Sequence, residues 1–468
     1  MSTEERNAMA KTGAESQNSG SISRRGMIGI TAAVAGGVAA LGSRPAAAQA
    51  PQAAPAVLTG TQKGRKYRAF IVFENPPSVS IQDSNARVET VTMKELAPDR
   101  MVVRTEAAQV CYSIVGQVSG GFLGGGIKKS GPVQILGHSA VGIVEAIGSQ
   151  VKRVQVGDRV MLANTPQCGV CYNCVRNRPD RCLNTRAENQ VIGNLADGRE
   201  VIQQHDRGGF AELVIATEQY AIPMFYNVDP VLLSTLGCSG GVGLGTTTGF
   251  EAPVDMGSDV VVIGCGPCGL SAVQGARIKG ASQIIAVEPI AARRAVAQQV
   301  GATTVIDPNV DTAHVVEKIK DLCKGPNPRT WSGGGHGLGG ADFVVEAVGG
   351  DYYPPKAGAG PDPTGLLPLH WAWDLCSPTG QVSTISIAQH GSFSIPAGQW
   401  SNGAKSHHPG NFNGVATLRD MQIYARLIER GQFNAKVLAT ATYPLDRTKD
   451  ALQAASDRTT VGGVLVFS

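Results

Sequence analysis

The feature that most constrains this chain is a group of four cysteines between positions 168 and 182. Cys168, Cys171, Cys174 and Cys182 have the spacing Cys-x2-Cys-x2-Cys-x7-Cys in a short polar stretch. Thiolates this close together can all reach one tetrahedral ion, and four sulfurs form the closed shell typical of structural Zn²⁺. Two disulfides are the alternative, but disulfides gain most by closing long loops, and these steps are short. We therefore expect a zinc-binding lobe.

The size and charge of the chain narrow its function class. Its 468 residues predict two to three domains, and a hydrophobic content of 42% is enough for packed cores. The net charge is only +4 and no dense stripe of Lys and Arg is present, so we expect no nucleic-acid partner. Ten cysteines are too few for a fold built on disulfides.

The N-terminus has the pattern of an export signal. Arg24 and Arg25 precede an apolar, Gly- and Ala-rich run, Ile28–Leu41, and small residues after it offer A-x-A cleavage sites. This pattern predicts a twin-arginine signal peptide over residues 1–50, followed by a Pro- and Ala-rich linker over 51–64. An uncleaved membrane anchor is the alternative, although the run is short for a span. We expect a periplasmic or secreted protein.

A dinucleotide-binding pattern lies in the second half of the chain. The unbroken β-branched run Asp259–Ile263 predicts a buried parallel strand, and a glycine-rich turn and a helix follow it. Gly264 allows a tight turn, Gly266 lets the backbone approach a pyrophosphate, and Gly269 lets helix and strand pack closely. Glu288 ends the next strand, where an acid binds the ribose diol and repels a 2′-phosphate. This pattern favours NAD over NADP.

The same turn contains a second motif. Cys265-Gly-Pro-Cys268 also spells a thiol–disulfide redox sequence. No Trp precedes it and the flanking glycines fit phosphate binding, so we favour the dinucleotide interpretation over thioredoxin-like chemistry; a structural disulfide between the two cysteines is a further alternative. Strands and helices alternate around the motif, which predicts a doubly wound parallel sheet.

The chain from about Ala69 to Ser468 resembles the zinc-dependent medium-chain alcohol dehydrogenases. The resemblance is carried by the cysteine lobe, the dinucleotide fingerprint and three further segments, Val110-Cys111-Tyr112-Ser113, Gly137-His138-Ser139 and Leu236-Gly237-Cys238. It implies an α/β protein with a GroES-like, β-rich catalytic domain over 65–237 and a Rossmann domain over 238–408. Residues 409–468 then return to the catalytic domain.

The resemblance also assigns site residues and cofactors. It implies two zinc ions per chain and one nicotinamide dinucleotide. Cys111, His138 and Cys238 correspond to the ligands of the catalytic zinc, and Ser113 corresponds to the hydroxyl that exchanges a proton with the substrate oxygen. A Cys/His/Cys set leaves a fourth position open for water or an alcohol. Buried structural thiols are the alternative for the two cysteines.

Five positions depart from the family pattern. Ser139 and Ile114 replace carboxylates near the catalytic zinc, and Gly116 replaces a histidine proton relay. Carboxylates in the outer shell raise the basicity of histidine ligands and fix their tautomer, so their loss can alter the chemistry. Tyr112 and Gly462 replace two basic residues that contact the pyrophosphate. We therefore expect backbone amides and the helix dipole to bind the phosphates.

The expected function is hydride transfer between a small alcohol or aldehyde and NAD. Because free NAD is scarce outside the cytoplasm, the export signal favours a variant in which NAD stays tightly bound. Such a protein would be an aldehyde dismutase-type enzyme, or one that uses an external electron acceptor. A non-catalytic exported zinc-binding protein is the alternative from another class. The family pattern also suggests a homodimer or homotetramer.

Overall fold

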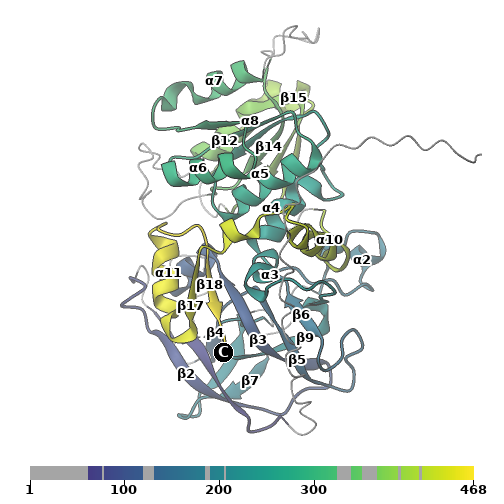
Figure 1. Cartoon of the computed structure of the whole chain (residues 1–468), viewed down its shortest axis with the longest axis vertical. Helices are drawn as coiled ribbons and strands as arrows, with labels where there is room; N and C mark the ends of the chain where they lie inside the picture. Colours follow the sequence, from purple (N-terminus) through teal and green to yellow (C-terminus); the bar gives the residue numbers. More distant parts are fainter. Residues whose placement is uncertain are drawn as a thin grey trace, which may run out of the picture. The chain divides into compact units, whose positions relative to one another are not determined.

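The computed structural model describes residues 62–75, 79–119, 131–184, 190–204, 207–323, 339–349, 366–387, 392–410 and 414–468 (Figure 1). The predicted signal peptide and most of the predicted linker lie outside these ranges. Among the helices of the described ranges, none combines the length and the apolar character that a membrane span requires.

The first half of the chain builds a small closed barrel. Its strands, in barrel order, are β1 (Lys66–Val72), β2 (Ala86–Met93), β7 (Val191–Asn194), β8 (Glu200–Gln203) and β4 (Val133–Ile135). Side chains such as Tyr67, Ile71, Ile135 and Val201 are buried in its core. Closing the sheet on itself leaves none of these five described strands as an open edge.

A seven-stranded sheet adjoins the barrel and leads to the site. Its order is β10 (Ala221–Pro223), β6 (Arg159–Leu162), β5 (Ala140–Ile147), β3 (Arg100–Val110), β18 (Gly463–Val466) and β17 (Ala441–Pro444), and β9 (Leu213–Thr217) also pairs with β3. Ala108 of β3 pairs with Leu465 of β18, so the end of the chain runs beside the strand that leads to Cys111 (Figure 1).

The second half forms a parallel sheet of six strands. Their order is β13 (Thr304–Ile306), β12 (Gln283–Val287), β11 (Asp259–Ile263), β14 (Ala341–Glu346), β15 (Cys376–Thr384) and β16 (Ser406–Pro409). Every neighbouring pair is parallel. Val260, Val261 and Val262 of β11 are all fully buried, because helices cover both faces of a doubly wound sheet. The predicted combination of a GroES-like domain and a Rossmann sheet is confirmed.

Helices connect and cover these sheets. Those of the dinucleotide half are α4 (Ser239–Thr248), α5 (Pro267–Lys279), α6 (Ala291–Val300), α7 (Val315–Leu322), α8 (Leu367–Leu375) and α9 (Ala397–Asn402). The others are α1 (Tyr112–Val118), α2 (Tyr172–Val175), α3 (Pro230–Leu236), α10 (Thr417–Glu429) and α11 (Thr448–Ser456). Single 3₁₀ turns cover Pro179–Arg181, Glu218–Tyr220, Thr312–His314, Ala435–Leu438 and Leu445–Arg447.

The glycines of α4 have a packing role. A Cβ at Gly243 would lie 2.2 Å from the carbonyl oxygen of Cys268 on α5, so only glycine allows the two helices to approach this closely. Helix α4 begins directly after Cys238, and α5 begins at the dinucleotide loop. Their close packing therefore links the backbone at one predicted zinc ligand to the predicted phosphate-binding turn.

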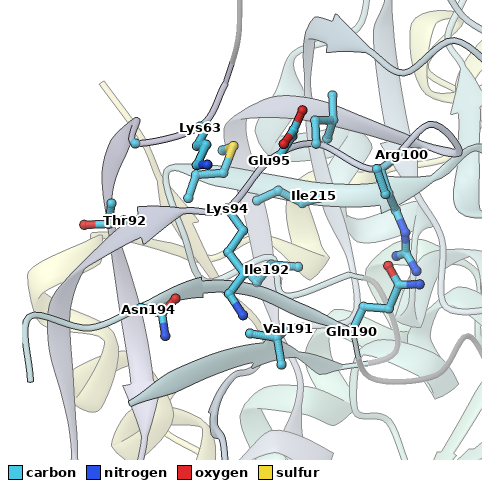
Figure 2. Close-up of a pocket in the computed structure, with 14 residues that line it drawn as sticks. Lys63, Thr92, Lys94, Glu95, Arg100, Gln190, Val191, Ile192, Asn194 and Ile215 are labelled. Atoms are coloured by element: carbon cyan, nitrogen blue, oxygen red, sulfur yellow. The ribbon is translucent and has the colours of Figure 1, made fainter. Parts of the chain in front are cut away.

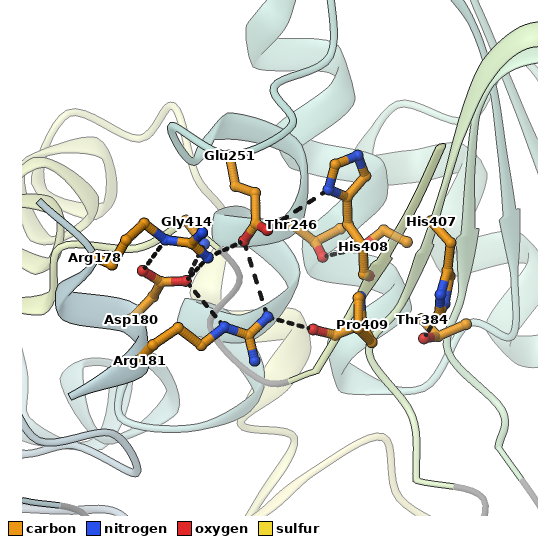
Figure 3. Close-up of polar contacts among 11 residues, drawn as sticks. Arg178, Asp180, Arg181, Thr246, Glu251, Thr384, His407, His408, Pro409 and Gly414 are labelled. Carbon is orange, nitrogen blue, oxygen red and sulfur yellow. Dashed lines mark hydrogen bonds and ion pairs between the residues drawn. The ribbon is translucent and has the colours of Figure 1, made fainter. Parts of the chain in front are cut away.

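A polar network ties the four-cysteine lobe to the parallel sheet (Figure 3). Asp180, whose side chain is fully buried, pairs with Arg178 at 2.9 Å and with Arg181 at 3.4 Å. Arg178 also pairs with Glu251 at 3.1 Å. Arg181 Nη2 donates at 2.8 Å to the carbonyl oxygen of Pro409, at the end of edge strand β16. Charge-assisted hydrogen bonds from the segment Arg178–Arg181 thus hold the lobe.

Candidate active site

Three distant segments bring Cys111, His138 and Cys238 together. Cys111 follows the last residue of β3 and precedes α1, and Cys238 precedes α4. His138 lies after β4, at a turn where Gly137 has φ +102° and a Cβ would lie 2.8 Å from the Phe210 ring. One ligand atom from each of the three residues lies within 4.8 Å of the other two.

The geometry of this cluster matches a metal-ligand set. The sulfurs of Cys238 and Cys111 are 3.8 Å apart, and His138 and Cys238 are each only 6% exposed. The hydrogen bond from Cys238 holds the pKa of Cys111 well below its usual range, with further lowering from His138. Sulfurs at the corners of a tetrahedron with zinc–sulfur bonds of about 2.3 Å are separated by about 3.8 Å.

Ser113, which the family resemblance implied as a site residue, lies at this cluster. Its hydroxyl donates to Cys111 Sγ at 3.2 Å and lies 3.1 Å from His138 Nε2. Ser113 is the second residue of α1, so the turn that carries Cys111 also carries this hydroxyl. It is therefore within reach of a substrate oxygen bound at the cluster.

The Nδ1 side of the His138 ring is without a carboxylate partner among the residues that the structure describes. Its Nδ1 is buried, and no hydrogen-bond partner for it occurs among the described residues. Ile114, at the position where the family pattern has an acid, is fully buried in an apolar cluster. Ser139 donates its hydroxyl at 2.6 Å to the carbonyl oxygen of Ser234 and is fully buried. The orientation of the His138 ring therefore depends on packing and on Nε2.

The dinucleotide loop has the expected shape. Gly264 has φ +88°, and a Cβ at Gly269 would lie 1.8 Å from the Gly264 carbonyl oxygen. A Cβ at Gly266 would meet no atom within 4 Å, because this residue faces open space. The carboxylate of Glu288 accepts hydrogen bonds from the N–H of Cys265 at 2.7 Å and of Ile290 at 2.8 Å. Loop and acid thus hold each other in place.

One cavity joins the two groups of residues. It has a volume of about 380 Å³. Cys111 and Ser113 line it, and so do Gly264, Gly266 and Glu288. Cavities of this size, largely apolar with a few polar groups, are typical of small-molecule and cofactor sites.

Sequence reasoning missed two basic residues of this cavity. Arg293 on α6 and Arg458 after α11 both line it. We expected only backbone amides and the helix dipole to face the phosphates there. Arg293 could have been found from its place five residues after Glu288, at the start of the next helix. Arg458 belongs to the C-terminal segment, and no local pattern there points to the dinucleotide loop.

The two cysteines of the dinucleotide loop are free thiols. Burial raises the pKa of Cys268 to about 12, with a smaller contribution from Cys111, and burial also raises the pKa of Cys265. Reactive redox cysteines have lowered pKa values, so these surroundings do not suit thiol–disulfide exchange.

The four cysteines of the lobe converge as well. Their sulfurs all lie within 4.8 Å of one another, with 3.9 Å between Cys168 and Cys174 and 4.0 Å between Cys171 and Cys182. All four are free thiols. The N–H of Leu183 donates to Cys171 Sγ at 3.4 Å, and backbone hydrogen bonds of this kind lower the pKa of Cys171 to about 6. The thiolate is the form of cysteine that binds zinc, and Cys171 favours it, whereas burial raises the pKa of Cys174 and Cys182.

A second cavity, of about 620 Å³, lies in the barrel region (Figure 2). Lys63, Lys94, Glu95 and Arg100 are among its lining residues. None of the predicted site residues lines it, so we do not assign it to the reaction.

Comparisons with known proteins agree with this arrangement. Residues 97–226 match the alcohol dehydrogenase GroES-like domain, and residues 267–355 match the zinc-binding dehydrogenase domain. A protein of Pseudomonas sp. described as an alcohol dehydrogenase is 34% identical over 227 residues, which are 46% of this chain and 66% of the relative. The chain spans between 56% and 66% of the length of the first four curated relatives.

Solved structures share the fold at low identity. Benzyl alcohol dehydrogenase from Acinetobacter calcoaceticus has a TM-score of 0.69 at 22% identity, covering 86% of this chain and 100% of that one. A zinc-binding dehydrogenase of Sinorhizobium meliloti 1021, bound to NADP, has a TM-score of 0.60 at 23% identity, with coverage of 86% and 100%. With both family models matched in order and the two cysteine-containing clusters formed, the chain combines an alcohol dehydrogenase GroES-like domain with a zinc-binding dehydrogenase domain.

Proposed function

We propose that this protein is a zinc-dependent oxidoreductase that transfers hydride between a small alcohol or aldehyde and NAD. The observation that carries the proposal is the shared cavity. Cys111, which lies beside His138 and Cys238, lines the same cavity as Gly266 and Glu288. Hydride transfer needs the reacting carbon and the nicotinamide within one enclosed site, and this arrangement can supply it.

The residues of the cluster fit a catalytic zinc. Cys111, His138 and Cys238 would hold it, since two thiolates and an imidazole form a known catalytic donor set. When bound, zinc supplies Lewis acidity, which lowers the pKa of an alcohol. Cys168, Cys171, Cys174 and Cys182 would hold a second, structural zinc with a closed shell of four sulfurs.

Ser113 has the place of a proton-transfer group. Its hydroxyl lies within hydrogen-bond distance of two proposed ligands and also lines the cavity. From there it can accept the proton of a substrate alcohol at Oγ, or return one to an aldehyde oxygen. Gly116, which lines the same cavity, has no side chain to pass this proton on, so its exchange depends on solvent.

The dinucleotide loop fits a nicotinamide cofactor, and Glu288 supports the preference for NAD. Gly266 leaves space in which a phosphate can approach the backbone. The Glu288 carboxylate is 3% exposed and lines the cavity, where its charge would repel a 2′-phosphate. A structure of this fold is bound to NADP, so NADPH is the proper comparison in any binding test.

Export would favour a protein that keeps NAD bound and regenerates it in place. A twin-arginine signal carries folded proteins, and a destination poor in free NAD favours retention of the cofactor. In that variant an aldehyde or an external electron acceptor regenerates the bound NAD. The substrate-facing partners remain small molecules, and a homodimer or homotetramer is the proposed assembly.

Activity measured alongside binding tests the proposal. We would load purified protein with zinc and follow the absorbance of NADH at 340 nm with a panel of small alcohols and aldehydes. Alcohol-dependent formation of NADH that disappears in His138→Ala would support the proposal. A protein that binds zinc at both clusters, yet neither binds NADH in a titration nor turns over, would instead be the non-catalytic zinc-binding protein.

A further inference from the structure

Arg458 has an unusual backbone conformation at the end of α11. Its φ is +57°, and besides it only Asn177 among the described non-glycine residues has a positive φ. The N–H of Arg458 donates to the carbonyl oxygen of Ala455, and that of Thr459 donates to Ala454. These two hydrogen bonds form a Schellman motif with Arg458 at the position where glycine is the usual residue. An arginine there carries a conformational cost that glycine would avoid.

This conformation presents Arg458 to the cavity beside the dinucleotide loop. Its guanidinium carbon lies 6.0 Å from the centre of the Tyr112 ring, and both residues line the cavity. Gly264 and Gly266 line the same cavity. Residues in strained backbone conformations cluster at active sites and ligand-binding sites.

Arg293 adds a second positive charge to the lining of this cavity. Arg293, Arg458 and Glu288 are the charged side chains among its described lining residues, so positive charge is in excess. Arg293 Nη2 donates to the carbonyl oxygen of Thr460 at 3.3 Å, which holds it beside the segment that carries Arg458. Burial lowers the pKa of Arg293, and the nearby charge of Arg458 lowers it further, whereas Glu288 raises it. Because the two positive charges act on each other, an anion bound beside them would be stabilised.

No basic side chain fits at position 462, where the family pattern has a residue that contacts the pyrophosphate. A Cβ at Gly462 would lie 2.1 Å from the carbonyl oxygen of Leu438. No side chain can therefore occupy that position without a shift of the backbone. Tyr112 is uncharged, so Arg293 and Arg458 supply the positive charge that this part of the cavity offers to a phosphate.

We propose that Arg458 binds the pyrophosphate of the nicotinamide dinucleotide, with Arg293 as the neighbouring cation. This inference rests on the proposed function, because it presumes that the dinucleotide occupies the cavity. Arg458 would pair with phosphate oxygens opposite the backbone amides of the glycine-rich loop. Arginine suits this role because its planar fork of N–H donors matches phosphate oxygens.

The test compares ligands that differ in their phosphates. Calorimetry would measure the affinity of adenosine, ADP, NADH and NADPH for the wild type, Arg458→Gly, Arg458→Lys and Arg447→Gln. Arg447 precedes the same helix at its opposite end, pairs with Asp450 and lies outside the cavity, so it is the matched control. Glycine suits φ +57°, so Arg458→Gly should fold with an unchanged or higher melting temperature.

We expect Arg458→Gly to weaken ADP and NADH binding by about 10- to 100-fold, the range for one charge-assisted hydrogen bond. Adenosine binding should not change, Arg458→Lys should recover part of the loss, and Arg447→Gln should match the wild type. Equal ADP and NADH affinities in Arg458→Gly and the wild type would overturn the inference, as would a loss confined to NADPH, which would mark a 2′-phosphate contact. A wild type that binds none of the four ligands would instead refute the proposed function.

Discussion

Asp180 offers a sharp test of how the cysteine lobe is held. Its carboxylate accepts from Arg178 Nε at 3.1 Å and Nη2 at 2.9 Å, and from the N–H of Gly414 at 3.4 Å. The Asp180 side chain is fully buried, whereas those of Arg178 and Arg181 are 41% and 39% exposed. In Asp180→Asn one charged acceptor is replaced by an amide of the same size, and its NH₂ group faces guanidinium donors.

The expected loss in the free energy of unfolding follows from these exposed fractions. Removing one member of a fully buried ion pair costs about 3–5 kcal/mol. Here the two arginines can turn toward water, so we expect a smaller loss of about 1–3 kcal/mol in the free energy of unfolding. Because Asp180 lies between Cys174 and Cys182, the loss should be concentrated in the lobe. Zinc held by the four cysteines should then be released faster to a chelator.

The assay measures zinc release to a coloured chelator together with urea unfolding. Asp197→Asn is the control, since Asp197 pairs with Arg199 at an exposed turn, and it should change neither measurement. Asp180→Asn should release one zinc per chain faster and leave the other at the wild-type rate. If both zinc ions are released at wild-type rates and the unfolding midpoint is unchanged, the network does not hold the lobe and our reasoning is wrong.

Three further predictions concern the loop, the N-terminus and the cofactor. Gly266→Ala should keep wild-type stability but weaken NADH binding in a titration, because its Cβ would occupy only the open space of the cavity. Gly269→Ala should lower the melting temperature, because its Cβ would lie 1.8 Å from the Gly264 carbonyl oxygen; equal stabilities of the two variants would contradict this. Replacing Arg24 and Arg25 with lysine should keep the precursor in the cytoplasm, as cell fractionation can check, and normal export would rule out a twin-arginine signal. NAD should be released in near-stoichiometric amount when the purified protein is denatured, since a ligand at about a thousandfold excess over its dissociation constant stabilises the folded state by about 4 kcal/mol. Protein that purifies without NAD and turns over with added NAD would be an ordinary dehydrogenase.

Sequence patterns predicted the dinucleotide half well. The strand Asp259–Ile263 has the predicted bounds, and the predicted helix after the glycine-rich turn and the predicted strand before Glu288 are present as α5 and β12. Runs of β-branched residues between glycine-rich turns encode this structure locally. Helix α8 was not predicted, because it follows a Gly- and Pro-rich stretch and its apolar residues are not evenly spaced. Edge strand β16 was also missed, since its sequence Ser-His-His-Pro has no strand pattern.

Some residues of the site could be predicted from neighbouring residues in the sequence, and others could not. The Cys168–Cys182 spacing is local, and these thiols converge as the spacing predicted. Cys111, His138 and Cys238 converge only through the pairing of distant strands, so the family resemblance was needed to select them. The contact of Arg458 with the cavity depends on β18 lying beside β3, and on a positive φ that no residue pattern indicates. Sequence reasoning therefore missed it.

The central claim is that two separate clusters each bind one zinc and that only one of them serves the reaction. Metal analysis of the purified wild type, Cys168→Ser and His138→Ala tests it most directly. The account predicts two zinc ions per chain in the wild type. In His138→Ala it predicts one zinc, retained NADH binding and no turnover; in Cys168→Ser it predicts loss of the lobe zinc. A wild type with one zinc that Cys168→Ser removes and His138→Ala leaves in place would contradict the claim of a catalytic zinc.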